Sequence, residues 1–154
     1  MRLTKKGKYA VSAMLDIALF ADKSNSFVKI QEISKRQSIP NSYLEQILSH
    51  LRRSGLLLSA TGPNGGYKLS RSSSNISIAD IVLSIEEKMD STQCGGSADC
   101  LSGEECLSHS LWSQLNDELE NFLRNKSLAN VLEKNTKKLT ATNFTQKEDL
   151  IAVG

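Results

Sequence analysis

The chain has 154 residues, of which 39% are hydrophobic and 23% charged, as in an ordinary water-soluble protein. No run approaches the ~18 apolar residues of a membrane span, and no apolar leader follows the early lysines, so we expect a cytoplasmic protein with no membrane partner. The net charge of +2 conceals an asymmetry: residues 1–71 carry twelve Lys and Arg against four Asp and Glu, which leaves the remainder at −6. This indicates a nucleic-acid-binding head and a separate sensing or assembly part, although solvated lysines alone would give the same charge.

The sequence of the head predicts three helices. Thr4 can cap a first helix that ends near residues 22–25 and has the apolar spacing of a buried face. A second helix is expected around 30–37, and a third from residue 41 or 42 to about 54. Two short helices joined by a turn of this length are typical of a helix-turn-helix, whose second helix lies in the major groove of DNA.

After Gly55 the pattern becomes that of strands. Residues 56–61 and 67–69 predict two strands around a Gly-rich turn at 62–66, which makes the head a winged helix. The start of the third helix should then face base edges, while its end and the wing lie near phosphates. The predicted DNA-contacting residues are Ser42, Tyr43, Glu45, Gln46, Arg52, Arg53, Gly62, Pro63, Gly65, Gly66 and Tyr67. The alternative is that the polar ones merely coat a helix.

A dense group of potential metal ligands follows a short helix that Ser77 and Asp80 should cap. Cys94, Cys100, Cys106 and His109 include all three cysteines and one of the two histidines. An odd number of clustered thiols does not make a disulfide framework, whereas thiolate sulfur suits soft or borderline metals. Zinc accepts three cysteines and one histidine, but its ligands usually come in pairs two to four residues apart.

The last predicted helix is the longest. It should run from about residue 105 to 124 and carry one apolar stripe, Leu111, Leu115, Leu119 and Phe122. The stripe is a candidate dimer contact, and its periodicity is equally compatible with packing inside one chain. Residues 127–133 can add a helical turn or two. Thr, Lys, Asn and Gln dominate from residue 135, where we expect a disordered tail.

Four stretches together resemble the IscR family of bacterial iron-sulfur cluster regulators. They are residues 1–10, Ser42 to Gln46, the wing from Gly62 to Tyr67, and the spaced cysteines. The resemblance covers roughly residues 1–133. The nitric oxide sensors NsrR and the iron regulators RirA are similar in the head and the cysteine spacing, but His109 matches the position where IscR proteins have a histidine. Thr61 departs from the arginine common there before the wing glycine, so one basic minor-groove contact is missing.

The resemblance implies a mainly α fold: a winged helix-turn-helix head with a two-stranded wing, and a long C-terminal dimerisation helix. The expected parts are a DNA-binding domain (1–72), a cluster-binding loop with the dimerisation helix (73–134) and the tail (135–154). It also implies a [2Fe-2S] cluster held by Cys94, Cys100, Cys106 and His109, and delivered by the iron-sulfur assembly machinery.

The function implied is that of a homodimer on a double-stranded DNA operator, repressing cluster-assembly genes when its cluster is bound. The sequence does not decide whether the protein represses or activates a given promoter. A nitric oxide-sensing repressor is the alternative within the superfamily, and a cluster carrier or electron-transfer module is the alternative outside it. No catalytic constellation accompanies the site, so we expect a non-enzyme.

Overall fold

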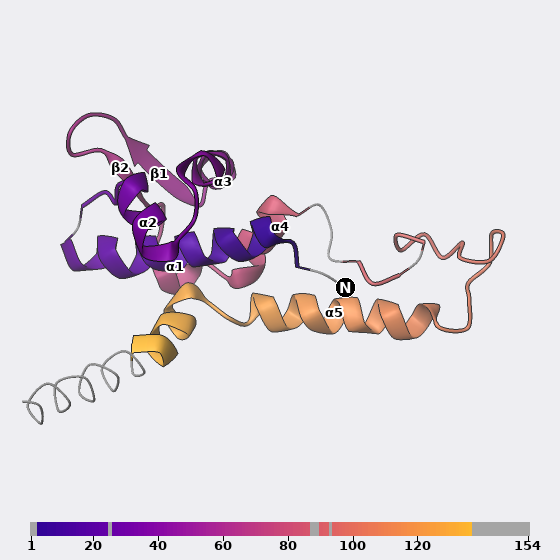
Figure 1. Ribbon diagram of the computed structural model, residues 1–154. Helices are drawn as coiled ribbons and strands as arrows, with labels where there is room; N and C mark the ends of the chain where they lie inside the picture. Colours follow the sequence, from indigo (N-terminus) through magenta and orange to yellow (C-terminus); the bar gives the residue numbers. More distant parts are fainter. Residues whose placement is uncertain (1–2, 25, 87–89, 93, 137–154) are drawn as a thin grey trace, which may run out of the picture.

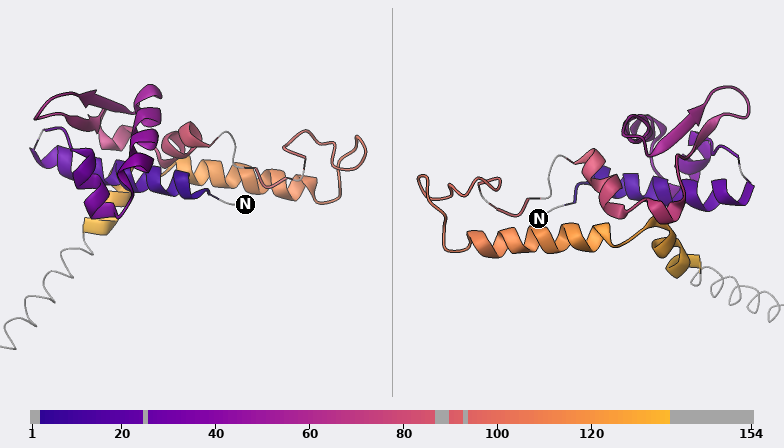
Figure 2. Two further views of the ribbon diagram at one scale, coloured as in Figure 1. Left: turned by 45° about the horizontal axis from the view of Figure 1, so that its top comes forward. Right: turned by 180° about the vertical axis from the view of Figure 1, so that it is seen from behind.

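The computed structural model describes residues 3–24, 26–86, 90–92 and 94–136. A compact head contains α1 (Lys5–Ser24), α2 (Ile30–Gln37), α3 (Asn41–Arg53), β1 (Leu57–Ala60), β2 (Gly66–Leu69), a short 3-10 turn η1 (Ser73–Asn75) and α4 (Ile78–Ile85). The last labelled helix, α5 (His109–Arg124), extends from beneath the head to the cysteine loop on one side (Figures 1 and 2). Among the described residues, no helix combines the length and apolar character that a membrane crossing needs.

The predicted helix-turn-helix is confirmed. Thr4 caps α1, because its hydroxyl accepts a hydrogen bond from the Gly7 N–H at 3.1 Å. Between α2 and α3 the chain turns through Ser38, whose φ of 54° is left-handed, and the next residue, Ile39, is buried. The inward side of α3 consists of Leu44, Ile47, Leu48 and Leu51, so the opposite side of this helix is left to solvent.

The wing is more than the predicted two-stranded hairpin. β1 and β2 pair antiparallel, with Leu57 opposite Leu69 and Ala60 opposite Gly66. In addition, Val28 and Tyr67 exchange two backbone hydrogen bonds of 2.8 Å, which ties the wing to the segment before α2. A Cβ at Gly66 would lie 2.3 Å from the Val28 carbonyl oxygen, so this close approach requires glycine.

The hydrophobic core continues past residue 72, the expected end of the head. The predicted capping box is present: Ser77 accepts from the Asp80 N–H, and Asp80 accepts from the Ser77 N–H, both at 3.0 Å. α4 packs against α1 and α3. The chain then returns after α5, where Leu128 is fully buried and donates its N–H to the Ile76 oxygen. The boundary at 72 stays a prediction, but the two sides share one core.

α5 begins at His109, four residues after the position that periodicity suggested. Residues 105 and 106 have no regular structure and residues 107–108 form a turn, in which the His109 N–H donates to the Cys106 oxygen at 3.1 Å. Leu107 therefore stands outside the helix and is fully exposed. Beyond α5, residues 128–136 are helical, two residues into the expected tail. The rest of that tail, 137–154, lies outside the described residues.

An ion pair between the partly exposed Arg36 and a buried carboxylate, which the sequence did not suggest, holds α2 on α1. Asp16 lies on the inner side of α1 with 2% of its surface exposed. Its carboxylate accepts two hydrogen bonds from Arg36, from Nη2 at 2.7 Å and Nε at 3.0 Å, and one from Gln37 at 2.8 Å. The Arg36 guanidinium also stacks 3.9 Å from the centre of the Phe20 ring. Hydrogen bonding to Asp16 raises the pKa of Arg36.

Arg36→Ala should lower the free energy of unfolding by about 3 kcal/mol, because it leaves the Asp16 carboxylate buried without its cation. Lys35→Ala changes an exposed cation on the same helix and should alter stability by less than ~0.5 kcal/mol. Urea denaturation followed by circular dichroism measures both. Equal effects of the two variants would show that the Asp16 pair contributes no more than a surface charge.

Candidate metal centre and nucleic-acid interface

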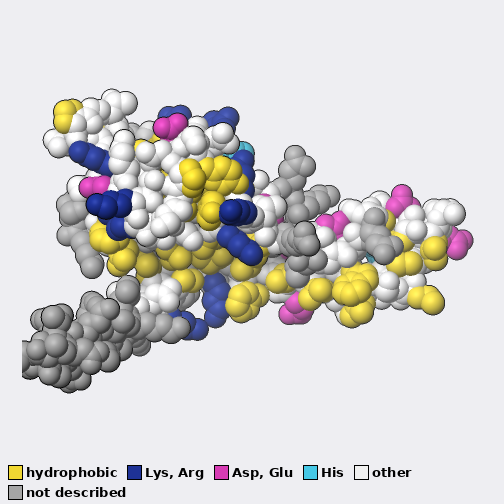
Figure 3. Space-filling view, in the orientation of Figure 1, with side chains coloured by type: hydrophobic (Ala, Val, Ile, Leu, Met, Phe, Trp, Pro, Cys, Tyr) yellow, Lys and Arg dark blue, Asp and Glu magenta, His cyan; other side chains and the backbone are white. Residues whose placement is uncertain are grey.

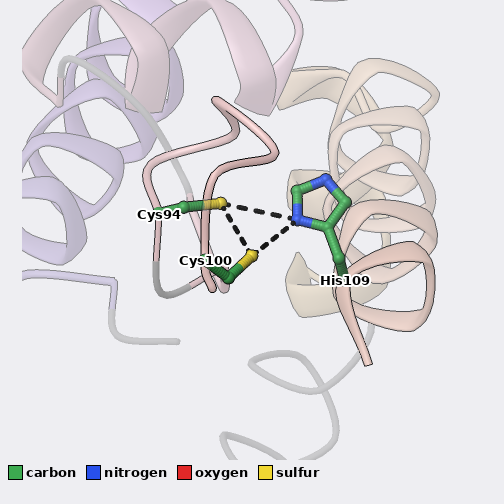
Figure 4. A group of neighbouring side chains, drawn as sticks. All are labelled: Cys94, Cys100 and His109. Atoms are coloured by element: carbon green, nitrogen blue, oxygen red, sulfur yellow. Dashed lines mark hydrogen bonds between the residues drawn. The ribbon is translucent and has the colours of Figure 1, made fainter. Parts of the chain in front are cut away.

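Three of the four predicted ligands meet at the N-terminal end of α5. The Cys94 and Cys100 sulfur atoms lie 3.3 Å apart, and His109 Nδ1 lies 3.4 Å from the first and 3.3 Å from the second (Figure 4). Their ligand atoms all fall within 4.8 Å of one another. Two thiols and an imidazole nitrogen converging on one point form a donor set suited to a soft or borderline metal centre.

Cys106 stands beside this group rather than in it. Its sulfur lies 3.5 Å from the Ser108 hydroxyl, and it also interacts with Cys100. The approach is produced by a tight hairpin in which Leu101 and Glu104 exchange two backbone hydrogen bonds of 2.9 Å. Both residues between them have positive φ, 48° at Ser102 and 99° at Gly103, as a type I′ turn requires. The hairpin thus returns Cys106 towards Cys100.

The beginning of the loop is fastened to α5 by Asn116, which sequence reasoning missed. The Asn116 side chain accepts from the Ser91 N–H at 2.9 Å and donates to Asp90 at 3.1 Å. It lies seven residues after His109 and therefore on the same side of the helix. That spacing is the one signal in the sequence that could have found it. A single helix face thus carries the imidazole and anchors the chain that leads to Cys94.

His109 is held in a defined environment. It is only 7% exposed, and while Nδ1 faces the thiols, Nε2 faces the Glu105 carboxylate at 4.0 Å. Nδ1 is therefore the ring nitrogen placed to bind a metal together with the two thiols.

Hydrogen bonding makes Cys94 the most acidic thiol of the loop. Desolvation acts to raise its pKa, but the Cys100 thiol, the N–H groups of Ala98 and Gly96 and the Thr92 hydroxyl together outweigh it and lower the pKa to about 6. Cys94 is therefore a thiolate at neutral pH, the form that binds metal.

The other two thiols shift in opposite directions. A backbone hydrogen bond at Cys106 lowers the pKa of Cys100, but its hydrogen bonds with the two neighbouring thiols and desolvation outweigh this, so the pKa is raised overall. The pKa of Cys106 is lowered, first by the Ser108 hydroxyl and then by the Cys100 thiol. Hydrogen bonding therefore favours the thiolate form at Cys94 and Cys106 over that at Cys100.

The predicted DNA-reading side chains form an exposed face on the head. Ser42, Glu45, Gln46, Arg52 and Arg53 are all exposed on α3, as are Gly62 and Pro63 at the tip of the wing. Figure 3 shows Lys and Arg side chains over the head and none over the loop end, where acidic side chains gather. This separation of charge agrees with the asymmetry of the sequence.

The predicted DNA-contacting residues differ in their exposure to solvent. Tyr43 is half-buried and packs edge-on against Tyr9, with 5.6 Å between the ring centres. In the wing, Gly65 is buried, and Gly66 and Tyr67 are half-buried. These residues are less accessible than the exposed side chains of α3 and the tip of the wing.

Comparison with known proteins decides the family. Residues 3–134 match Rrf2, described as iron-dependent transcriptional regulator. The chain belongs to the Rrf2 family. It is 44% identical over 135 residues to the HTH-type transcriptional regulator IscR of Vibrio atlanticus (strain LGP32), which covers 88% of this chain and 77% of that protein. It is 45% identical over 132 residues to IscR of Escherichia coli O1:K1, covering 86% of this chain and 80% of that protein.

Solved structures of the Rrf2 family agree with the fold. The structure of T. potens IscR matches with a TM-score of 0.72 and 29% identity, over 87% of this chain and 88% of that one. CymR, the global cysteine regulator of B. subtilis, matches with a TM-score of 0.74 and 25% identity, over 87% and 98%. The predicted winged-helix fold and the resemblance to IscR are confirmed. This Rrf2-family chain is a DNA-binding transcription regulator and not an enzyme.

At pH 7, iodoacetamide should alkylate Cys94 of the cluster-free protein roughly three to ten times faster than Cys100, because only thiolates react and the lower pKa slightly weakens the nucleophile. The rate at Cys94 should fall to half near pH 6, its pKa, and continue to fall at lower pH. Peptide mass spectrometry over a time course measures both. Faster labelling at Cys100 would show that hydrogen bonding does not favour the Cys94 thiolate over that of Cys100.

Proposed function

We propose that this Rrf2-family regulator binds a [2Fe-2S] cluster through Cys94, Cys100, Cys106 and His109, and that cluster occupancy controls its binding to DNA. The observation that carries the proposal is the convergence of Cys94, Cys100 and His109 Nδ1 within 4.8 Å. When bound, the cluster supplies a redox-sensitive and labile iron centre. Cys106, which interacts with Cys100, would complete the ligand set.

The residues present fit such a group in type and in protonation. Iron-sulfur clusters are held mostly by thiolates, and histidine replaces cysteine in some two-iron centres. The pKa values of Cys94 and Cys106 are both lowered, so deprotonating either of these ligands costs less free energy than deprotonating an ordinary thiol. The description of the family, iron-dependent transcriptional regulator, supports an iron centre over zinc.

The proposed regulation is repression of iron-sulfur cluster assembly genes by the cluster-bound form, in the cytoplasm. The assembly machinery would then be both the donor of the cluster and the product of the repressed genes. When clusters are scarce the site empties and repression is relieved. The nitric oxide-sensing alternative has no separate support among the described residues, and the basic reading face of the head argues against a carrier module.

The regulator is proposed to act as a homodimer. On α5, Leu111 (57%), Leu115 (37%) and Phe122 (58%) are exposed, as is Trp112 (38%). Leu119 on the same stripe is partly buried. Packing inside the described part of the chain thus leaves much of the stripe accessible, and a second copy would bury it and place two α3 helices on one duplex.

Protein purified without oxygen should contain about two irons and two acid-labile sulfides per chain. Replacing Cys94, Cys100 or Cys106 by Ala should abolish the cluster, and His109→Ala should leave it weakly held. Iron and sulfide analysis with absorption spectroscopy measures this, and Ser110→Ala, next to His109 and exposed, serves as the control. Stoichiometric zinc without sulfide would refute the cluster.

Gln46→Ala should relax sequence preference at one base pair by about 1–3 kcal/mol, because a side chain that reads a base edge is lost. Arg53→Ala should weaken all duplexes alike and reduce the salt slope by about one. Binding to specific and scrambled duplexes at several salt concentrations separates the two. Arg124→Ala, on α5, is the control for loss of charge. Identical, sequence-independent losses for Gln46 and Arg53 would mean that the reading face lies elsewhere.

Leu115→Glu should shift the protein from dimer to monomer in sedimentation analysis and lower operator affinity at least tenfold, because it buries a charge in the stripe. The matched control is Asn121→Glu, which adds the same charge to an exposed position on another side of α5. A dimeric Leu115→Glu variant with unaltered affinity would place the dimer contact outside this stripe.

A further inference from the structure

A single carboxylate connects the end of α4 with the first turn of α1. Glu86 follows α4 directly, and its Oε1 accepts hydrogen bonds from the Thr4 N–H at 2.8 Å and from the Thr4 hydroxyl at 2.6 Å. The same hydroxyl accepts from the Gly7 N–H. The first turn of α1 lies beside the end of α4 (Figures 1 and 2). Glu86 thus caps α1 from a point 82 residues away along the chain.

Gly7 is explained by this contact. It lies inside α1, where glycine normally weakens a helix relative to alanine. A Cβ there would stand 2.4 Å from Glu86 Oε1 and 3.2 Å from its carboxyl carbon. The obstructing atoms are the far end of a flexible side chain, so alanine would displace the carboxylate and leave the helix in place. Glycine at position 7 thus leaves the space in which the Glu86 carboxylate approaches α1.

The turn that Glu86 caps also reaches the recognition helix. Lys5 Nζ lies 5.5 Å from the centre of the Tyr9 ring, and Tyr9 packs at 86° against Tyr43, the third residue of α3. A cation and two rings in edge-to-face contact therefore run from the start of α1 to the start of α3. A change in the first turn of α1 alters the support of the residues beside Ser42 and Glu45.

We propose that Glu86 is a positioning residue for DNA recognition, which fastens the Lys5–Tyr9–Tyr43 contact to the chain that leads into the cysteine loop. Glu86 is the last described residue before that chain continues to Asp90 and Cys94. This inference rests on the proposed function. It adds that a change in the cysteine loop alters the exposed face of α3 through the Glu86 carboxylate. Cluster occupancy then changes operator affinity by changing the position of Glu86.

Three variants separate the positioning role from simple stability. Glu86→Ala removes the acceptor, and Gly7→Ala keeps the acceptor but displaces it. Glu86→Gln retains an oxygen that can accept from Thr4. Glu118→Ala, which removes an exposed acid from α5, is the control. Thermal melts report stability, and binding is measured to a duplex selected by the wild-type protein from a random library and to a scrambled duplex.

The two disrupting variants should bind the selected duplex at least fivefold more weakly than wild type, with a smaller loss on the scrambled one, and the glutamine variant should stay within about twofold. Stability should follow a different pattern. Gly7→Ala should raise the melting temperature in the Glu86→Ala background, where no carboxylate is in the way, and raise it less or lower it in wild type. Losses of affinity that merely track melting temperature would overturn the proposal.

Comparison of cluster-loaded and cluster-free protein tests the connection to the loop. The ratio of their affinities for the selected duplex should move towards one in Glu86→Ala and Gly7→Ala and keep its wild-type value in Glu118→Ala. An unchanged ratio in all variants would refute transmission through Glu86. If wild type itself gives a ratio of one, the proposed sensing function fails, while the cluster-free protein still decides whether Glu86 positions the reading face.

Discussion

The arrangement of the molecule depends on a short backbone pairing between two segments far apart in sequence. The Ile78 N–H donates to the Lys126 oxygen at 2.8 Å, and the Leu128 N–H donates to the Ile76 oxygen at 3.0 Å. With Leu128 fully buried in the head, this pairing fixes the end of α5. The other end, roughly 22 Å away at 1.5 Å per residue, carries His109. The loop is thus held at a set distance from the helices of the head.

The electrostatic environment of the thiols depends on where α5 begins. The first N–H groups of a helix have no partner within it and carry partial positive charge. Cys106 lies just ahead of that end, and the N–H groups of Ser108 and His109 help to lower its pKa. Had the helix started at residue 105, as periodicity suggested, Cys106 would have been inside it. The later start creates an anion-stabilising end next to the thiols and supplies the imidazole as the first helical residue.

Local signals in the sequence were enough for much of the head. The bounds of α2, the capping box of α4 and the inward side of α3 all follow from short-range spacing, which a sequence displays directly. The convergence of Cys94, Cys100 and His109 could also be predicted, since these residues lie close together in the chain. What could not be predicted were contacts between distant segments: Val28 with Tyr67, Asp16 with Arg36, and Glu86 with Thr4. None of these leaves a periodic pattern, because each depends on how whole elements pack.

The pairing of Val28 with Tyr67 also bears on how readily the hairpin can aggregate with other chains. A hairpin that projects from a domain offers two rows of unsatisfied backbone groups, to which strands of other molecules can add. Val28 pairs with Tyr67 in the row on β2. The outer edge of β1 is four residues long and carries the exposed Leu58. The wing therefore presents a smaller template for aggregation than a hairpin without the Val28 pairing would.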